Sequence, residues 1–163
     1  MPVHCFMKLR FLPTPLLAAS LLLTTFGCAK KDDPAAAPVT GTGSYKLDNT
    51  TITCQAKALT SSASSGGLTY DYLEVDLTTT PQPASGAEIL KLYFFKPGGQ
   101  PANAFTLREI TLDTKGGTYP FANDVTTLTS PSTGTFSGTF SATASGTVPY
   151  RTITAGVFTN ARP

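Results

Sequence analysis

The chain of 163 residues is long enough for one folded domain with a single core. Its formal net charge is only +2, and without residues 1–27 ten Lys and Arg residues balance ten Asp and Glu residues, so no basic surface is expected and nucleic acid is excluded as a partner. Abundant Thr, Ser, Gly and Pro between short apolar runs favour an all-β fold.

Residues 1–27 have the three-part pattern of a secretory signal peptide. Lys8 and Arg10 precede an apolar segment, Phe11–Phe26, that is shorter than the ~20 apolar residues of a membrane-spanning helix. A start at Met7 gives a more compact leader, and we expect translation to begin there.

The stretch TTFGC, residues 24–28, resembles a bacterial lipobox. In that motif a small residue, here Gly27, precedes a cysteine that becomes the lipid-modified N-terminus. The resemblance implies that Cys28 carries a lipid anchor and holds the protein on a membrane. The alternative is cleavage after Ala29 by an ordinary signal peptidase, which would remove Cys28 with the leader.

The following stretch, AKKDDP, is similar to the tract behind the anchor cysteine of Bacteroidetes-type surface lipoproteins. The resemblance implies an outer-membrane protein that faces the cell exterior, with the periplasmic face as the alternative. The implied sorting signal consists of Lys30, Lys31, Asp32 and Asp33. A solvated linker would also explain these charges.

Residues 28–44 are expected to form the anchor and a flexible linker, because their Pro, Ala, Gly and Thr residues show no periodicity. Residues 45–163 are expected to form the all-β domain. Its predicted strands are Thr51–Leu59, Leu68–Thr78, Ala87–Phe95, Phe105–Asp113, Thr118–Phe121, Val125–Leu128, Gly134–Ala144 and Thr152–Asn160. Close spacing and Gly-rich turns favour an antiparallel β-sandwich, with a small up-and-down or calycin-like barrel as the alternative.

One hairpin allows a prediction of register. If Thr78 lies opposite Ala87, then Leu73 pairs with Leu92 and Val75 with Leu90 on one face, and Tyr72 pairs with Tyr93 and Glu74 with Lys91 on the other. A slip of one residue would mix apolar and charged side chains on both faces. The Leu and Val face is therefore predicted to be the core.

The opposite face of this hairpin is the possible ligand-binding face, because aromatic rings on a rigid sheet can stack against a sugar or another flat ligand. Its residues are Tyr70, Tyr72, Glu74, Lys91, Tyr93 and Phe95. The alternatives are that a second layer covers these rings, or that they only stabilise a half-exposed sheet.

Catalytic and metal chemistry find little support in the sequence. Glu74 and Asp76, about 7 Å apart on one strand face, have the spacing of a carboxylate pair in an inverting glycosidase, but Lys91 is placed to neutralise Glu74. Asp71 points to the other face and no calcium-binding loop is present, so we expect neither a metal nor a cofactor. Cys54 alternates with apolar residues and is predicted to be a buried, inert thiol.

The C-terminal stretch, with its halves GTFSGTF and ITAGVFTN, is similar to a closing hairpin in small domains of unknown function on Bacteroidetes-type lipoproteins. That resemblance implies an all-β fold and no known activity. We expect a non-enzymatic binding module for a glycan, a peptide or an outer-membrane partner protein. The alternatives are a structural coat or spacer protein and, less favoured, a hydrolase that uses Glu74 and Asp76.

Overall fold

The structure, a computed structural model, describes residues 40–129, 134–144 and 151–163. In these residues the regular elements are eight β-strands and one short 3-10 helix, η1 (Ala102–Ala104). The strands are β1 (Gly41–Leu47), β2 (Thr50–Ser65), β3 (Leu68–Thr79), β4 (Ile89–Pro97), β5 (Thr106–Thr114), β6 (Gly117–Thr129), β7 (Phe136–Ala144) and β8 (Thr152–Ala161).

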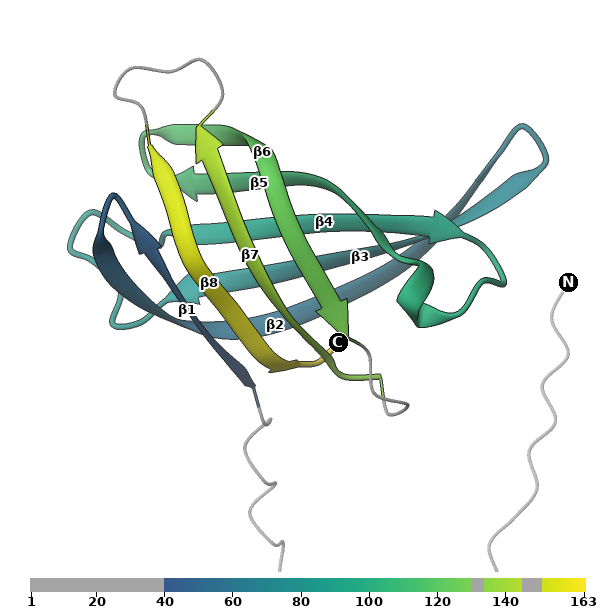
Figure 1. Cartoon of the computed structure of the whole chain (residues 1–163), viewed down its shortest axis with the longest axis horizontal. Coiled ribbons are helices and arrows are strands. Elements are labelled where there is room, and N and C mark those ends of the chain that lie inside the picture. Colours follow the sequence, from purple (N-terminus) through teal and green to yellow (C-terminus); the bar gives the residue numbers. More distant parts are fainter. Residues whose placement is uncertain (1–39, 130–133, 145–150) are drawn as a thin grey trace, which may run out of the picture. The chain divides into compact units, whose positions relative to one another are not determined.

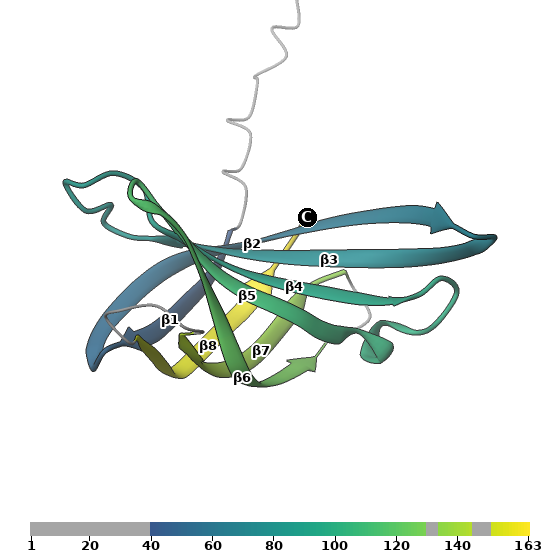
Figure 2. The ribbon, with the colours of Figure 1, turned by 90° about the horizontal axis from the view of Figure 1, so that it is seen from above.

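The strands form a closed antiparallel barrel (Figures 1 and 2). Each strand pairs with the next along the chain, and β8 pairs with β1. The all-β class is confirmed, whereas the predicted sandwich is wrong and the up-and-down barrel is observed. The physical reason lies in the long strands: β2 pairs with β1 over residues 50–56 and with β3 over residues 54–65. Because one long strand is hydrogen-bonded to both neighbours, β1, β2 and β3 belong to a single sheet, and this sheet closes into a barrel instead of dividing into two.

The first strand was not expected. Residues 41–44, which the sequence pattern assigned to the linker, form the start of β1. A Cβ atom on Gly41 would lie 2.4 Å from the backbone oxygen of Thr159 in β8, and one on Gly43 would lie 3.0 Å from Leu77 Cδ2. The glycines that suggested a flexible tether therefore allow β1 to approach its neighbours closely.

Two predicted strands are one strand in the structure. Residues 118–121 and 125–128 both belong to β6, and the pairing of β6 with β7 shifts between Ala122 and Val125. Such a shift lets one strand bend and continue. The other predicted strands are present, with ends that differ by a few residues.

The predicted register of the β3–β4 hairpin is wrong by two residues. Val75 lies opposite Leu92, Tyr72 opposite Phe95, and Lys91 opposite Asp76. A shift of two residues leaves each side chain on its predicted face, because side chains along a strand alternate with a period of two. The prediction that Leu73, Val75, Leu90 and Leu92 are buried is therefore confirmed.

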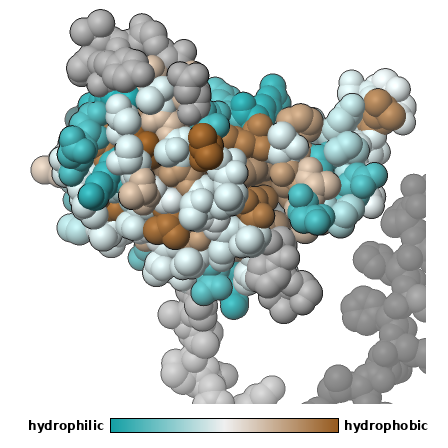
Figure 3. All heavy atoms as spheres, in the orientation of Figure 1, coloured by the Kyte–Doolittle hydropathy of each residue, from teal (hydrophilic) through white to brown (hydrophobic). Residues whose placement is uncertain are grey.

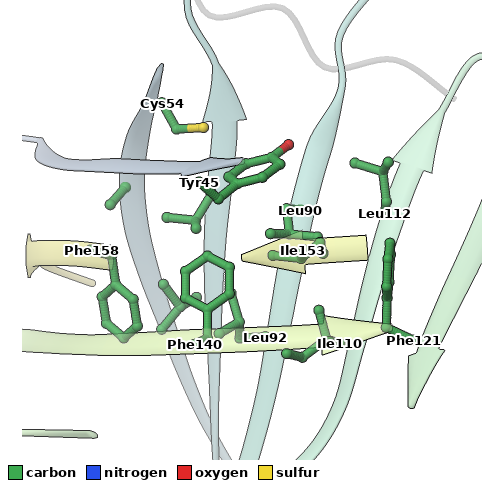
Figure 4. Close-up of a cluster of buried hydrophobic side chains, with 14 of the residues drawn as sticks. Tyr45, Cys54, Leu90, Leu92, Ile110, Leu112, Phe121, Phe140, Ile153 and Phe158 are labelled. Atoms are coloured by element: carbon green, nitrogen blue, oxygen red, sulfur yellow. The ribbon is translucent and has the colours of Figure 1, made fainter. Parts of the chain in front are cut away.

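Inward-facing side chains fill the barrel (Figure 4). The aromatic rings of Tyr45, Phe140 and Phe158 lie among aliphatic side chains from several strands. The largest side chains that are fully buried belong to Tyr45, Phe158, Leu73, Leu77, Leu90, Leu92, Ile110, Leu112, Ile153 and Val75. An eight-stranded barrel is just wide enough for such a packed interior.

Cys54 projects into this core as predicted, and its thiol is free. Burial raises the pKa of Cys54 to about 11, so the thiol stays protonated at neutral pH. Burial also raises the pKa of Tyr45, whose side chain lies in the same core. A protonated, buried thiol is unreactive, in agreement with the interpretation of Cys54 as a packing residue.

The outer surface is mixed in character. On the face formed by β6, β7 and β8, apolar residues are scattered among polar ones (Figure 3). Scattered apolar residues of this kind are normal on a folded surface. Within the described ranges, no helix has the length and apolar character needed to cross a membrane.

Candidate binding groove

The six residues of the predicted binding face all lie on the outer surface of β3 and β4. Each of them is half-buried rather than fully covered: Tyr70, Tyr72, Glu74, Lys91, Tyr93 and Phe95. The strands of the described part of the chain form one closed sheet, so no second sheet packs over this face.

A groove of about 550 Å³ crosses the outer face of four neighbouring strands. It is lined by Leu59, Thr60 and Ser61 of β2, Tyr72, Leu73 and Glu74 of β3, Tyr93 and Phe94 of β4, and Arg108 and Glu109 of β5. Leu73 and Phe94 are buried, so they contribute backbone to the floor. The groove has the volume of a typical small-molecule site and combines two tyrosine rings with a few charged groups.

A β-bulge gives the groove its charged wall. Tyr93 of β4 pairs with Glu109 of β5, and the next residue, Phe94, pairs with Leu107. Arg108 is therefore the extra residue in β5, and Arg108 and Glu109 are both exposed where strict alternation would turn one of them inward. Bulges re-aim side chains in this way and are common beside functional sites.

A second hollow continues the groove. It has a volume of about 430 Å³ and is lined by Tyr70, Tyr72, Phe95 and Arg108. Tyr72 and Arg108 are common to both hollows. Together the two hollows form an extended surface with four aromatic rings, which we call the outer groove.

Lys91 lies outside the lining and supports it from one side. Its Nζ is 3.1 Å from Glu74 Oε1 and 3.5 Å from Asp113 Oδ2. The predicted ion pair of Glu74 and Lys91 is thus present, although the two residues are not directly opposite each other. Its hydrogen bond with Glu74 raises the pKa of Lys91, which stays charged and fixes the Glu74 carboxylate at the groove.

Asp76 forms a carboxyl pair with Glu74. Burial, then a hydrogen bond with Glu74 and the charge of Glu74, raise the pKa of Asp76 to about 6. Asp76 Oδ1 is buried without a hydrogen-bond partner. A carboxyl group with a raised pKa holds its proton more readily at mildly acidic pH than an ordinary surface carboxyl group does.

The raised pKa of Asp76 leads to a prediction about stability. Because this pKa lies above the value of about 3.9 in the unfolded chain, stability falls as the pH rises from about 4 to about 6 and stays lower at higher pH. Asn cannot ionise, so Asp76→Asn should raise the free energy of unfolding by about 1–2 kcal/mol at pH ~8 and change it little at pH ~3.5. Urea unfolding followed by circular dichroism at both pH values measures this. Parallel pH profiles of the variant and the natural chain would contradict it.

One mouth of the barrel holds a second polar cluster. The ammonium group of Lys96, which is buried, binds Asp71, and Ser62 Oγ donates a hydrogen bond of 2.6 Å to Asp71 Oδ1. Lys96 Nζ also lies 5.3 Å from the centre of the Phe105 ring. The hydrogen bonds from Lys96 and Ser62 lower the pKa of Asp71. Asp71 lies on the face opposite Glu74 and Asp76, as predicted.

Residues 40–129, 134–144 and 151–163 contain no cluster of three or more His, Cys, Asp or Glu side chains placed to hold a metal ion. Lys91 forms ion pairs with Glu74 and Asp113, and Lys96 forms an ion pair with Asp71. Each of the two lysines in these pairs is bound to at least one carboxylate, as hydrogen bonding requires for partly buried charges.

Seven lining residues were not predicted as part of the binding face: Leu59, Thr60, Ser61, Leu73, Phe94, Arg108 and Glu109. Thr60 and Ser61 were missed because the predicted strand ended at Leu59, whereas β2 continues to Ser65, and Leu59 was missed because no pairing of this strand with β3 was predicted. Arg108 and Glu109 were missed because no pairing of β5 was predicted. Two adjacent charges inside an otherwise alternating strand are the signal that could have indicated the bulge.

No family model matches the sequence, and neither a curated protein nor a solved structure matches it. The likeness to Bacteroidetes-type lipoproteins therefore rests on the sequence motifs alone. The predicted anchor residue, Cys28, and the predicted sorting signal, Lys30–Asp33, lie outside the described residues.

Proposed function

We propose that the chain is a surface lipoprotein whose barrel is a non-enzymatic binding module, and that the outer groove binds a glycan. The observation that carries the proposal is the groove of about 550 Å³ with Tyr72 and Tyr93 beside three charged side chains. Ligand sites are typically concave, mostly apolar and supplied with a few fixed polar groups.

A glycan fits the chemistry of this groove better than a flat apolar ligand. Tyrosine rings pack against the apolar faces of sugar rings, and their hydroxyl groups can also form hydrogen bonds. Glu74 and Glu109 can accept hydrogen bonds from sugar hydroxyl groups, and Arg108 can donate them. The second hollow, lined by Tyr70, Tyr72, Phe95 and Arg108, extends the surface and suits a ligand of several sugar units.

The anchor belongs to the same proposal. Lipid on Cys28 would hold the protein on the outer membrane, and Lys30–Asp33 would direct the barrel to the cell exterior. The residues between this anchor and β1, which begins at Gly41, would place the groove at a distance from the lipid surface. Such a protein would present its groove to glycans outside the cell.

The proposal is tested by screening the full chain against an array of neutral and acidic oligosaccharides, followed by titration calorimetry with the sugars that bind. Tyr93→Ala and Tyr72→Ala should each weaken binding about tenfold or more, because each removes a ring from the centre of the groove. Tyr119→Ala is the matched control: Tyr119 is also half-buried but packs under Arg151, away from the groove, and should leave affinity unchanged.

Several results would contradict the proposal. An array without any bound sugar would favour the structural coat or spacer alternative. Equal affinity losses for Tyr93→Ala and Tyr119→Ala would show that the loss does not arise in the groove. Release of shorter sugars over time, abolished by Glu74→Gln or Asp76→Asn, would indicate the hydrolase instead.

A further inference from the structure

The second hollow of the outer groove carries one charged side chain, Arg108, among three aromatic rings. The rings belong to Tyr70 and Tyr72 of β3 and to Phe95 of β4, which lies opposite Tyr72. Arg108 comes from the bulge in β5, beside β4. The described residues that line this hollow of about 430 Å³ therefore supply a cation and aromatic rings, and no carboxylate.

The protein itself does not use the guanidinium group of Arg108. The ion pairs of the described chain involve the other two cations near this surface, Lys91 and Lys96. Within the part of the chain that the structure describes, Arg108 forms neither an ion pair nor a side-chain hydrogen bond, and it is exposed. A guanidinium group has five N–H donors in a fixed planar arrangement, and in Arg108 they are open to a ligand.

The first hollow of the outer groove has a different charge character. Its lining includes Glu74, which Lys91 neutralises, and Glu109, which takes part in no ion pair within the described residues. Tyr72 and Arg108 line both hollows and so lie at their boundary. The outer groove thus changes along its length, from a hollow with a cation and no carboxylate to a hollow with two carboxylates.

We propose that the second hollow binds an acidic sugar unit, with its carboxylate on Arg108 and its ring against the aromatic side chains, and that the first hollow binds the neutral unit next to it. The preferred ligand is a glycan in which acidic and neutral sugar units alternate. This inference rests on the proposed function and specifies the ligand of the same groove.

A uronic acid matches the second hollow because its charge and its apolar face belong to one sugar ring. Its carboxylate can reach a guanidinium group while the ring packs on the neighbouring aromatic side chains. A guanidinium group binds a carboxylate through two parallel hydrogen bonds, which a lysine cannot do. In the first hollow, a second carboxylate would be repelled by Glu74 and Glu109, whereas sugar hydroxyl groups can donate hydrogen bonds to both.

An acidic peptide is the other class of partner that a free arginine could bind. Extended peptides commonly bind a sheet by adding a strand at an open edge. The strands that carry the three rings are paired on both sides at this point. Tyr72 lies between Ser61 of β2 and Phe95 of β4, and Phe95 in turn pairs with Thr106 of β5. Only side chains of these strands face the ligand, which favours ring stacking over main-chain recognition.

Titration calorimetry of the full chain with three tetrasaccharides tests the inference. One alternates glucuronic acid with N-acetylglucosamine, one contains galacturonic acid only, and one contains N-acetylglucosamine only. The alternating tetrasaccharide should bind about tenfold more tightly than the neutral one, because its carboxylate can bind Arg108. It should bind about threefold more tightly than the uniformly acidic one, and Glu109→Gln should reduce that difference because it removes a repelling charge.

Substitution of Arg108 identifies the group that recognises the carboxylate. Arg108→Gln should weaken binding of the alternating tetrasaccharide about fivefold to tenfold, and should not change binding of the same tetrasaccharide after its carboxyl groups are reduced to alcohols. Arg108→Lys keeps the charge but loses the paired hydrogen bonds, so it should weaken binding about threefold. Lys46→Gln is the matched control, because it removes one positive charge from an exposed position on β1, outside both hollows, and should leave affinity unchanged.

The contrary results separate this inference from the proposed function. Equal binding of the alternating and neutral tetrasaccharides, or equal losses in Arg108→Gln for the acidic and reduced forms, would overturn the acidic subsite and leave glycan binding in place. Equally tight binding of an oligoglutamate peptide would overturn it in favour of an acidic protein partner. Binding of none of the three tetrasaccharides would also overturn it, and the proposed function would fail with it if no other sugar binds.

Discussion

Cys28→Ala is expected to remove the protein from the membrane fraction or to leave an unprocessed precursor. The reason is that a lipobox without its cysteine cannot receive lipid. One acyl chain binds a membrane reversibly, at about 0.8 kcal/mol for each buried CH₂ group, so the several chains of a lipoprotein anchor make attachment essentially permanent. Fractionation of cells, with mass spectrometry of the mature N-terminus, measures the effect.

The matched control keeps the cysteine and changes only the tract that follows it. Replacement of Lys30, Lys31, Asp32 and Asp33 by alanine should leave the protein lipidated and membrane-bound but facing the periplasm, which protease treatment of intact cells detects. A mature N-terminus at Lys30 without lipid would contradict the anchor. Unchanged protease sensitivity of the alanine variant would contradict the sorting signal.

The fold class followed from local pattern, whereas the closure of the sheet did not. Alternation of apolar and polar residues identified most strands, because one face of each strand packs in the core. Closure of the sheet depends on which strands bend and pair with two neighbours. In β6 the register of pairing with β7 shifts between Ala122 and Val125, and in the sequence this irregularity looked like a gap between two short strands. β1 was lost for a related reason, since Gly41 and Gly43 resemble linker residues.

The hairpin of β3 and β4 shows what alternation can and cannot determine. It correctly assigned Leu73 and Val75 to the core and Tyr72 and Glu74 to the surface. It did not determine the register, because shifts of two residues preserve both faces. The register is set where the pairing ends, with Thr79 N–H donating to Glu88 O at 3.0 Å, and the loop sequence between these residues specifies no standard turn.

The candidate site was predicted in part for the same reason. The residues on β3 and β4 could be assigned to one outward face without knowledge of their neighbours. The wall formed by Arg108 and Glu109 depends on the bulge in β5 and on the pairing of β5 with β4, which are properties of the assembled sheet. Arg108 lines both hollows, so the shape of the outer groove could not be read from the hairpin alone.

A reciprocal pair of glycines and phenylalanines joins β7 to β8 and leads to the largest expected effect on stability. Gly138 lies opposite Phe158, and Phe140 lies opposite Gly156. A Cβ atom on Gly156 would lie 2.5 Å from Phe140 Cδ2, so the ring occupies the space that a side chain would need. Phe140→Ala should lower the free energy of unfolding by about 3–5 kcal/mol through lost packing, and Gly156→Ala by about 1–3 kcal/mol through overpacking.

The double variant distinguishes this specific contact from general damage to the core. In Phe140→Ala with Gly156→Ala, the added methyl group enters part of the space left by the ring, so the double variant should be more stable than the sum of the single effects by about 0.5–3 kcal/mol. Urea unfolding followed by circular dichroism gives all the values. Gly116→Ala is the control, because its Cβ would meet two side-chain oxygens, of Tyr119 at 3.3 Å and of Thr114 at 3.6 Å, and should change stability by no more than about 0.5 kcal/mol. Strict additivity of the two core substitutions would show that the ring and the glycine do not depend on each other.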